Sequence, residues 1–331
     1  VIDQVNSTGF GLTMGIHPRI EERAIQFAKL SRAGNIYVNR NMIGAIVGVQ
    51  PFGGRGLSGT GPKAGGPNYL PRLMKEKATQ VPVELVKEDP ALATDEKSIR
   101  EANKLMISAA NVEKAWRLTE LNTRISHLRQ ALAEVAKLEV IDDFADDLDR
   151  TLATARAQLI NIERKMKKPV VLPGPTGESN ILYLEPRGNL VVFADKDVTF
   201  HYWLMALVTA LATGNTVTAV VSDLFFEEAV AFRDKFNATA APFGVLQVAR
   251  LRHLQPLLAH QAIAGVVIKS DCPRSAYVAT QLASREGAIL PTIKAEYDDN
   301  LIQRLVTEKT VSIDTTASGG NTSLMTLTEE D

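Results

Sequence analysis

The sequence predicts an α/β protein whose C-terminal half contains a parallel sheet. Beyond Pro169, short runs rich in β-formers alternate with helical stretches, and this rhythm is typical of a parallel sheet with helices on its faces. The expected strands cover 180–185, 189–194, 216–221, 244–249, 264–269 and 288–294, with helices near 200–212, 225–238 and 274–285. The tail from Thr310 is rich in Ser, Thr and Gly, and its alternating stretch 323–327 predicts an edge strand.

A helical segment precedes this part. Residues 95–168 are nearly free of Gly and Pro, and one apolar stripe with helical spacing runs through Leu148, Leu152, Ala155, Leu159, Ile162 and Met166. Core packing between helices is the favoured interpretation, and a coiled coil is the alternative. The aperiodic stretch 81–90, rich in Pro, Glu, Lys and Asp, indicates a linker. We therefore expect three parts: residues 1–80, 81–170 and 171–331.

Composition limits the classes of function. With 331 residues and 45% hydrophobic content, the chain can bury more than one core. Its 37 basic and 38 acidic residues leave a net charge of −1, so the chain lacks the excess of positive charge that is typical of proteins that bind nucleic acid. The single cysteine, Cys272, cannot form an intramolecular disulfide, and no apolar run approaches a membrane span, so we expect a cytoplasmic location. Because the chain begins at Val1 and not at Met, we expect a fragment of a longer polypeptide.

Glycine is concentrated in residues 44–66, which hold nine of the 22 glycines. The segment follows a predicted helix (residues 20–30) and a short buried strand (34–39). Apolar residues separate the glycines, which is unusual for a flexible linker, although a linker stays the alternative. A glycine-rich apolar loop allows the backbone to approach a ligand closely, so we predict a substrate-binding wall here.

The motifs of this region resemble the end of an aldehyde dehydrogenase catalytic domain. They are Asn-Ser-Thr-Gly-Phe-Gly-Leu-Thr from Asn6, Ala-Gly-Asn-Ile-Tyr-Val-Asn-Arg-Asn from Ala33, Gln-Pro-Phe-Gly-Gly from Gln50, and Ser-Gly-Thr-Gly-Pro from Ser58. More narrowly, they are similar to the L-glutamate γ-semialdehyde (pyrroline-5-carboxylate) dehydrogenase module of bacterial proline utilization A proteins.

The resemblance implies site residues. In that family, the loop before Gln-Pro-Phe anchors the aldehyde, so the main-chain N–H groups of Gly44 and Ala45 would hold the α-carboxylate of the substrate, glutamate semialdehyde. Phe52 would be an aromatic wall beside its aliphatic part, with plain core packing as the alternative. The nucleophilic cysteine, general base, oxyanion asparagine and NAD domain of the family would precede Val1. We therefore expect no catalytic residue in this chain and no activity from it alone.

Residues 172–300 resemble the beginning of an aldehyde dehydrogenase, but as a degraded copy. Asp197 stands where the family has its oxyanion asparagine, and a carboxylate would repel a developing alkoxide. Val220 and Val221 replace a Lys-Pro pair whose lysine contacts the adenosine ribose. We interpret Glu296 as a solvated acid and Cys272 as an inert thiol. We predict no cofactor-binding residue and no metal site in this chain.

Taken together, these features predict an aldehyde dehydrogenase end, a helical connector and a non-catalytic Rossmann-like domain. The resemblance also implies a parent with an FAD-dependent proline dehydrogenase, contact with upstream domains of the same polypeptide, a homo-oligomer, and peripheral membrane association of the parent. Residues 315–324 would belong to a lid over the path between two active sites. The alternatives are a regulatory nucleotide-binding module and an oligomerisation module.

Overall fold

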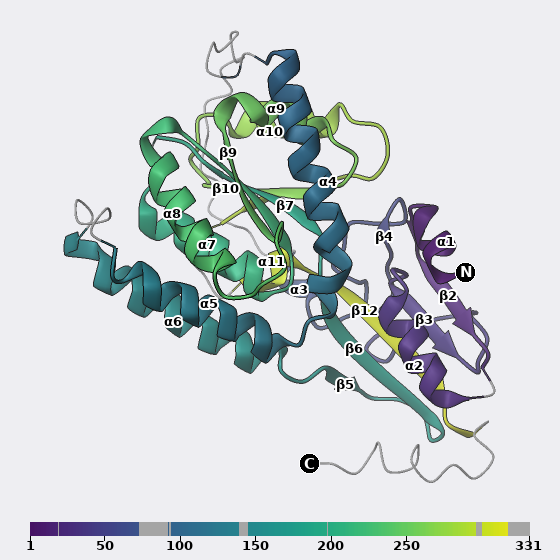
Figure 1. Cartoon of the computed structure of the whole chain (residues 1–331). Coiled ribbons are helices and arrows are strands. Elements are labelled where there is room, and N and C mark those ends of the chain that lie inside the picture. The colour runs from purple at the N-terminus through teal and green to yellow at the C-terminus, as the bar shows by residue number, and fades with distance from the viewer. Residues whose placement is uncertain are drawn as a thin grey trace.

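The computed structural model of the chain describes residues 1–18, 20–72, 92, 94–138, 145–196, 198–295 and 300–316. Within these residues the strands form two five-stranded sheets and one small two-stranded ladder (Figure 1). One sheet is parallel throughout and the other is mixed. The small ladder pairs β1 (Phe10–Gly11) with β4 (Arg55–Gly56) in antiparallel orientation.

The parallel sheet confirms the rhythm predicted beyond Pro169 from residue 189 onward. The first predicted strand, 180–185, was wrongly placed in it, because β6 (Glu178–Pro186) lies in the mixed sheet, antiparallel to its neighbours. Its order is β11-β10-β7-β8-β9, so the chain starts in the middle, winds to one edge and returns to the other. β7 and β8 occupy the predicted residues, whereas β11 begins later than predicted and covers three residues. The strands are β7 (Asn189–Ala194), β8 (Thr216–Val221), β9 (Leu246–Arg250), β10 (Ile263–Ile268) and β11 (Thr292–Lys294).

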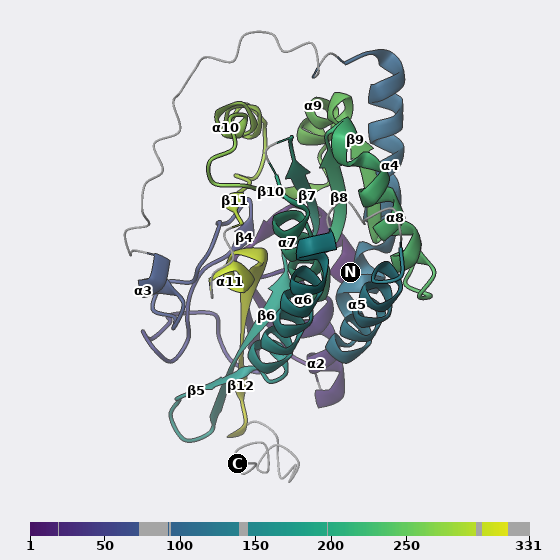
Figure 2. The same cartoon turned by 90° about the vertical axis from the view of Figure 1, so that its left-hand side faces the viewer.

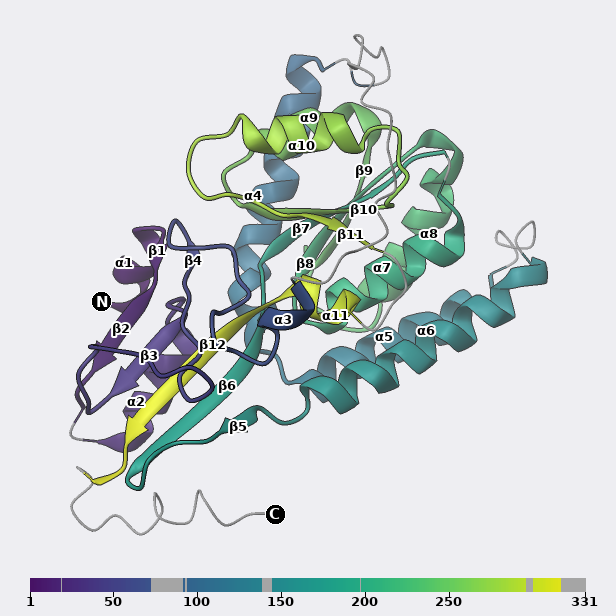
Figure 3. The same ribbon diagram turned by 180° about the vertical axis from the view of Figure 1, so that it is seen from behind.

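Helices cover both faces of this sheet, as Figures 2 and 3 show from two sides. On one face lie α5 (Leu121–Val135), α6 (Ala145–Met166), α7 (Phe200–Ala212), α8 (Phe226–Asn237) and α11 (Leu301–Leu305). On the other lie α4 (Glu96–Leu118), α9 (Leu254–Ala259) and α10 (Ser275–Ala283). Short 3-10 turns at Asp223–Phe225 and Leu251–His253 precede α8 and α9. The helices α9 and α11 are too short to give a periodic signal, and the sequence did not predict them.

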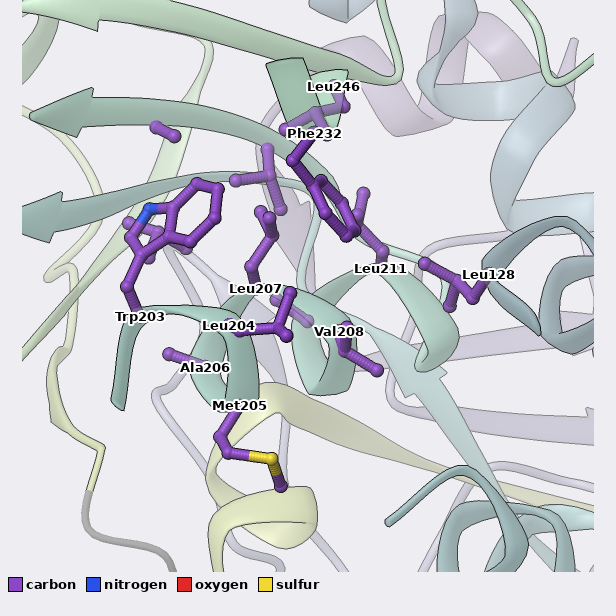
Figure 4. Packing of buried hydrophobic residues seen from close by; sticks show 14 of the residues in the cluster. Leu128, Trp203, Leu204, Met205, Ala206, Leu207, Val208, Leu211, Phe232 and Leu246 are labelled. Atoms are coloured by element: carbon purple, nitrogen blue, oxygen red, sulfur yellow. The ribbon is translucent and has the colours of Figure 1, made fainter. Parts of the chain in front are cut away.

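The core of the first face is built around α7, which is apolar on nearly all sides (Figure 4). Thr199 caps its first turn by accepting a hydrogen bond from the amide of Tyr202. The α6 stripe packs against this helix, and the prediction that it forms core is confirmed. Its fully buried members are Leu152, Ala155, Leu159 and Ile162, and Leu148 and Met166 are partly buried.

The mixed sheet joins distant parts of the chain in the order β2-β3-β12-β6-β5. β12 runs parallel to β3 and antiparallel to β6, and so occupies the central position. The sequence did not predict β12, because the Ser-, Thr- and Gly-rich stretch that begins at Thr310 gave no strand signal before 323–327. The predicted strand at 323–327 lies outside the described residues. The strands are β2 (Thr13–Ile16), β3 (Asn35–Val38), β5 (Val170–Leu172), β6 (Glu178–Pro186) and β12 (Val306–Asp314).

The two faces of the mixed sheet differ in polarity. The apolar face, with Ile36, Val38, Val311 and Ile313, packs under α2 (Glu21–Leu30). Because side chains alternate along a strand, the opposite face presents Asn35, Thr310 and Ser312, which are buried polar residues. The glycine-rich segment covers this polar face, and α1 (Ile2–Ser7) and α3 (Tyr69–Arg72) flank the segment.

Asn215 fixes the place where the two sheets meet. Its Oδ1 accepts hydrogen bonds from the amides of Arg187 (2.8 Å) and Gly188 (3.1 Å), between β6 and β7. Its Nδ2 donates to the carbonyl of Leu305 (3.0 Å), where α11 gives way to β12. One buried amide therefore sets both crossings of the chain between the sheets.

Candidate functional site: a glycine-rich loop with two unpartnered amides

The candidate site is the loop that follows β3. The chain leaves the strand through Asn39, at φ +56°, and turns again at Gly44 (φ +80°) and Gly48 (φ +79°). A Cβ placed on Gly44 would find no heavy atom within 4 Å, so the demand for glycine there comes from the backbone angle and not from crowding. Residues 41–48 are exposed. We call residues 41–49 the anchor loop.

Two adjacent main-chain donors in the anchor loop lack an acceptor. The neighbouring amides are used, since Ile43 donates to Asn41 Oδ1 (3.1 Å) and Ile46 donates to Gln50 Oε1 (3.0 Å). Among the described residues, the amides of Gly44 and Ala45 have no hydrogen-bond acceptor, and the same holds for those of Asn41, Met42 and Val47 in this exposed loop. Paired free N–H groups on an exposed, side-chain-poor backbone can bind a carboxylate.

Phe52 is held firmly beside this loop. It exchanges two backbone hydrogen bonds with Ala64, at 3.0 and 2.9 Å, in an isolated antiparallel bridge. The carbonyl of Pro51 accepts from Asn35 Nδ2 (2.8 Å) and Thr310 Oγ1 (2.9 Å), both on the polar face of the mixed sheet. The side chain of Phe52 is half-buried, so part of its surface is available to a ligand.

Lys63 is a buried cation behind Phe52. Its Nζ donates to Asn35 Oδ1 (2.6 Å) and to the carbonyl of Gly53 (2.7 Å). Burial, with a further contribution from the charge of Arg55, lowers the pKa of Lys63 to about 7. The neutral amine would still donate both bonds, because it keeps two N–H groups for these two acceptors.

A cavity of about 670 Å³ lies elsewhere, between the glycine-rich segment and the turn before β11. Its lining includes Arg32, Arg55, Arg285 and Glu308, but not Gly44, Ala45 or Phe52. The first two cations already pair with carboxylates, Arg32 with Glu113 (2.5 Å) and Arg55 with Glu185 (2.8 Å). The predicted anchor residues therefore form an exposed surface and not a wall of this cavity.

The predicted degenerate positions of the second unit are described only in part. Val220 and Val221 are buried in β8, one in the core on each face of the parallel sheet. Cys272 is buried in the apolar cluster beneath α9 and α10, as expected for an inert thiol. Asp197 and Glu296 lie outside the described residues, as does the lid segment after Thr316.

The residues that the structure describes show neither a candidate metal site nor a membrane-spanning helix. Within them, no group of three or more His, Cys, Asp or Glu side chains is arranged to hold a metal ion. None of the helices in this part of the chain has the length and apolarity needed to cross a bilayer.

One part of the chain is similar to a known protein family. Residues 1–79 match the model of the aldehyde dehydrogenase family. The chain is also 45% identical, across 76 residues, to 1-pyrroline-5-carboxylate dehydrogenase 1 of Halalkalibacterium halodurans, a match that covers 23% of this chain and 15% of that protein. The anchor loop and Phe52 thus lie in a part of the chain related to aldehyde dehydrogenases.

The relationship extends further for one group of these proteins. The chain is 36% identical over 331 residues to the bifunctional protein PutA of Salmonella typhimurium and 34% identical over 330 residues to that of Escherichia coli, with 99% of this chain covered in both. It is therefore homologous to the C-terminal part of bacterial PutA, and it spans about a fifth of the length of these relatives. A crystal structure of Proline Utilization A from Bradyrhizobium japonicum shares the fold, with a TM-score of 0.54 at 24% identity over 60% of this chain and 22% of that one.

Sequence reasoning missed the residues that support the anchor loop. Asn35, Arg40 and Lys63 lie within or next to the quoted motifs, but a motif does not say which side chains turn inward. Glu178 lies far along the chain, in the Gly-Glu-Ser-Asn stretch, and meets the loop only because β6 and β3 both pair with β12.

Proposed function

We propose that this chain is the C-terminal part of an enzyme that oxidises L-glutamate γ-semialdehyde, the open form of pyrroline-5-carboxylate, to glutamate with NAD. In this proposal the enzyme acts in proline catabolism and is fused to an FAD-dependent proline dehydrogenase. Homology to PutA over the whole chain supports it, as does the higher identity, over 76 residues, to a pyrroline-5-carboxylate dehydrogenase.

The pair of unpartnered amides at Gly44 and Ala45 carries the proposal. A substrate carboxylate would accept from both, and the absence of side-chain crowding at Gly44 permits that approach. The exposed part of Phe52 would contact the methylene groups between the carboxylate and the aldehyde. These residues bind and orient the substrate and do not enter the chemical step.

NAD would accept the hydride, and upstream residues would bind the cofactor and supply the reacting groups.

Two buried valines support a non-catalytic role for the second unit. Val220 and Val221 fill the core on opposite faces of β8, where neither offers a hydrogen-bond donor to a ribose. Calorimetric titration of the 331-residue chain with NAD should give no heat of binding, and micromolar affinity would favour the regulatory nucleotide-binding module.

The test of the proposed function is NADH formation from glutamate semialdehyde. The full-length polypeptide should turn the substrate over, whereas residues 1–331 alone should not. A Gly44→Ala variant of the full-length protein should raise KM, because an L-residue is strained at φ +80° and the loop amides would move. Turnover by residues 1–331 alone, or an unchanged KM for Gly44→Ala, would contradict the assignment.

A further inference from the structure

One carboxylate contacts both ends of the anchor loop. Glu178, the first residue of β6, accepts hydrogen bonds from Arg40 just before the loop and from Gln50 just after it. Arg40 bonds to Oε2 and Gln50 bonds to Oε1, so the two loop ends use different oxygens of the same group. The contact closes the loop from a strand more than a hundred residues away in the sequence.

The amide of Gln50 can lie in only one orientation. Its Oε1 accepts from the Ile46 amide at 3.0 Å, inside the anchor loop, while its Nε2 donates to Glu178. The reversed amide would place a donor against the Ile46 N–H and an acceptor against the carboxylate. Gln50 is only 3% exposed, so water cannot easily replace either partner. Glu178 therefore acts on the loop interior through Gln50.

The carboxylate itself is held by the centre of the mixed sheet. Asn180 Nδ2 donates to Glu178 Oε1 at 2.8 Å, and Ser312 on β12 donates to Asn180 Oδ1 at 2.6 Å. On the other side, the guanidinium of Arg40 lies over the ring of the buried Tyr37, 5.3 Å from its centroid. The side chains of Arg40 and Glu178 are 17% and 15% exposed, so the pair is largely shielded from water.

We propose that Glu178 is a positioning residue for substrate recognition, holding the anchor loop through Arg40 and Gln50 in the conformation that presents the Gly44 and Ala45 amides. This inference rests on the proposed function. The loop is exposed and Gly44 has no neighbouring heavy atom around its missing side chain, so few other contacts restrict it. We call these contacts of Glu178 with Arg40 and Gln50 the clamp. Without the clamp, a bound carboxylate has to order the loop itself, and the affinity for the substrate falls.

Steady-state kinetics of the full-length enzyme test the proposal with Glu178→Gln. We expect KM for glutamate semialdehyde to rise about tenfold with kcat within about twofold of wild type, because a binding interaction is lost and the chemical groups are untouched. KM for propanal, which has no carboxylate, should not change. Glu163→Gln, which breaks an ion pair with Arg129 on the helical side, is the matched control and should leave both values unchanged.

Substitutions of Arg40 give a second test of the proposal. Arg40→Met should reproduce the rise in KM, and Arg40→Lys should recover part of the affinity because it keeps the charge. An unchanged KM in Glu178→Gln, or equal rises for the semialdehyde and propanal, would overturn the positioning role. Equal effects of Arg40→Met and Arg40→Lys would do the same.

Hydrogen exchange separates this inference from the proposed function. In the full-length protein, the hydrogen-bonded amides of Ile46, Gly48 and Val49 should exchange about tenfold faster in Glu178→Gln than in wild type, while the β7 and β8 amides stay unchanged. A wild-type protein that oxidises propanal but not the semialdehyde would refute the proposed substrate. Faster loop exchange would then still support the clamp, and unchanged exchange would refute it.

Discussion

Lys309 on β12 lies 2.5 Å from Glu185 on β6, measured from Nζ to Oε1, inside the mixed sheet. The same ammonium donates to the carbonyls of Ala28 (2.8 Å) and Ser31 (2.7 Å) at the end of α2, where the helix dipole favours a cation. Burial acts to raise the pKa of Glu185, but the charges of Lys309 and Arg55 outweigh it and lower the pKa to about 2. One side chain thus connects the last described strand to α2.

Removing this ammonium should destabilise the fold strongly. Lys309→Met leaves the largely shielded Glu185 with one partner fewer and leaves two carbonyls at the end of α2 unpaired, so we expect a loss of about 3–5 kcal/mol in the free energy of unfolding. Urea denaturation followed by circular dichroism measures it. Lys114→Met removes an exposed pair with Asp3 and should leave the midpoint nearly unchanged. Equal midpoints for the two variants would show that the buried pair is not a major source of stability.

Lys63 predicts a dependence of stability on alkaline pH. Its pKa in the folded chain, about 7, lies below the ordinary value of 10.5, so the folded state releases this proton first as pH rises. The unfolded chain binds more protons between these values, and the free energy of unfolding should therefore rise with pH across that window. Lys63→Met should flatten the rise, while Lys137→Met on the surface should keep it. Urea titrations between pH 7 and 10 decide the matter, and an unchanged slope in Lys63→Met would contradict it.

Two glycines near Phe52 should respond differently to a methyl group. A Cβ on Gly34 would lie 2.1 Å from the carbonyl oxygen of Gly53, a backbone atom that cannot move freely, whereas a Cβ on Gly53 would lie 3.4 Å from its nearest neighbours. Gly34→Ala should cost about 1–3 kcal/mol through overpacking, and Gly53→Ala should cost clearly less. Thermal unfolding compares them. A larger loss for Gly53→Ala would show that the two segments do not pack as described.

The two tryptophans offer a matched pair in the core of the parallel sheet. Both are fully buried, but Trp116 donates its indole N–H to the Leu211 carbonyl at 3.2 Å, while the N–H of Trp203 has no acceptor among the described residues. Each change to Phe removes similar volume, so the difference reports on the hydrogen bond. Trp116→Phe should be the more destabilising by about 1 kcal/mol. Urea denaturation measures both, and the reverse order would contradict the pairing.

A strand of this fold could be predicted from the sequence where its buried side chains are apolar, and it could not be predicted where they are polar. β8 could be placed to the residue because Thr216–Val221 is a run of mostly β-branched residues between a Gly-Asn turn and a serine. β12 could not, because its interior carries Lys309, Thr310 and Ser312, which read as a polar tail. Their partners come from α2, β6 and the loop before Phe52, up to 281 residues away.

The candidate site was also only partly predictable from the sequence. Gly44, Ala45 and Phe52 were placed by their motif, and their role in binding stays a prediction. The clamp of Arg40, Gln50 and Glu178 depends on strand pairing across the chain, which no local pattern encodes.

The central place of β12 bears on how the polypeptide folds as it is made. Synthesis proceeds towards the C-terminus, so β3 and β6 leave the ribosome long before the strand that lies between them. Until residues 306–314 emerge, each keeps a row of unsatisfied backbone groups along one side, a surface prone to wrong pairing. A messenger RNA truncated before the codon for Val306 would leave the backbone groups on one edge of β3 and of β6 unpaired. Its product should therefore be a target for chaperones and proteases.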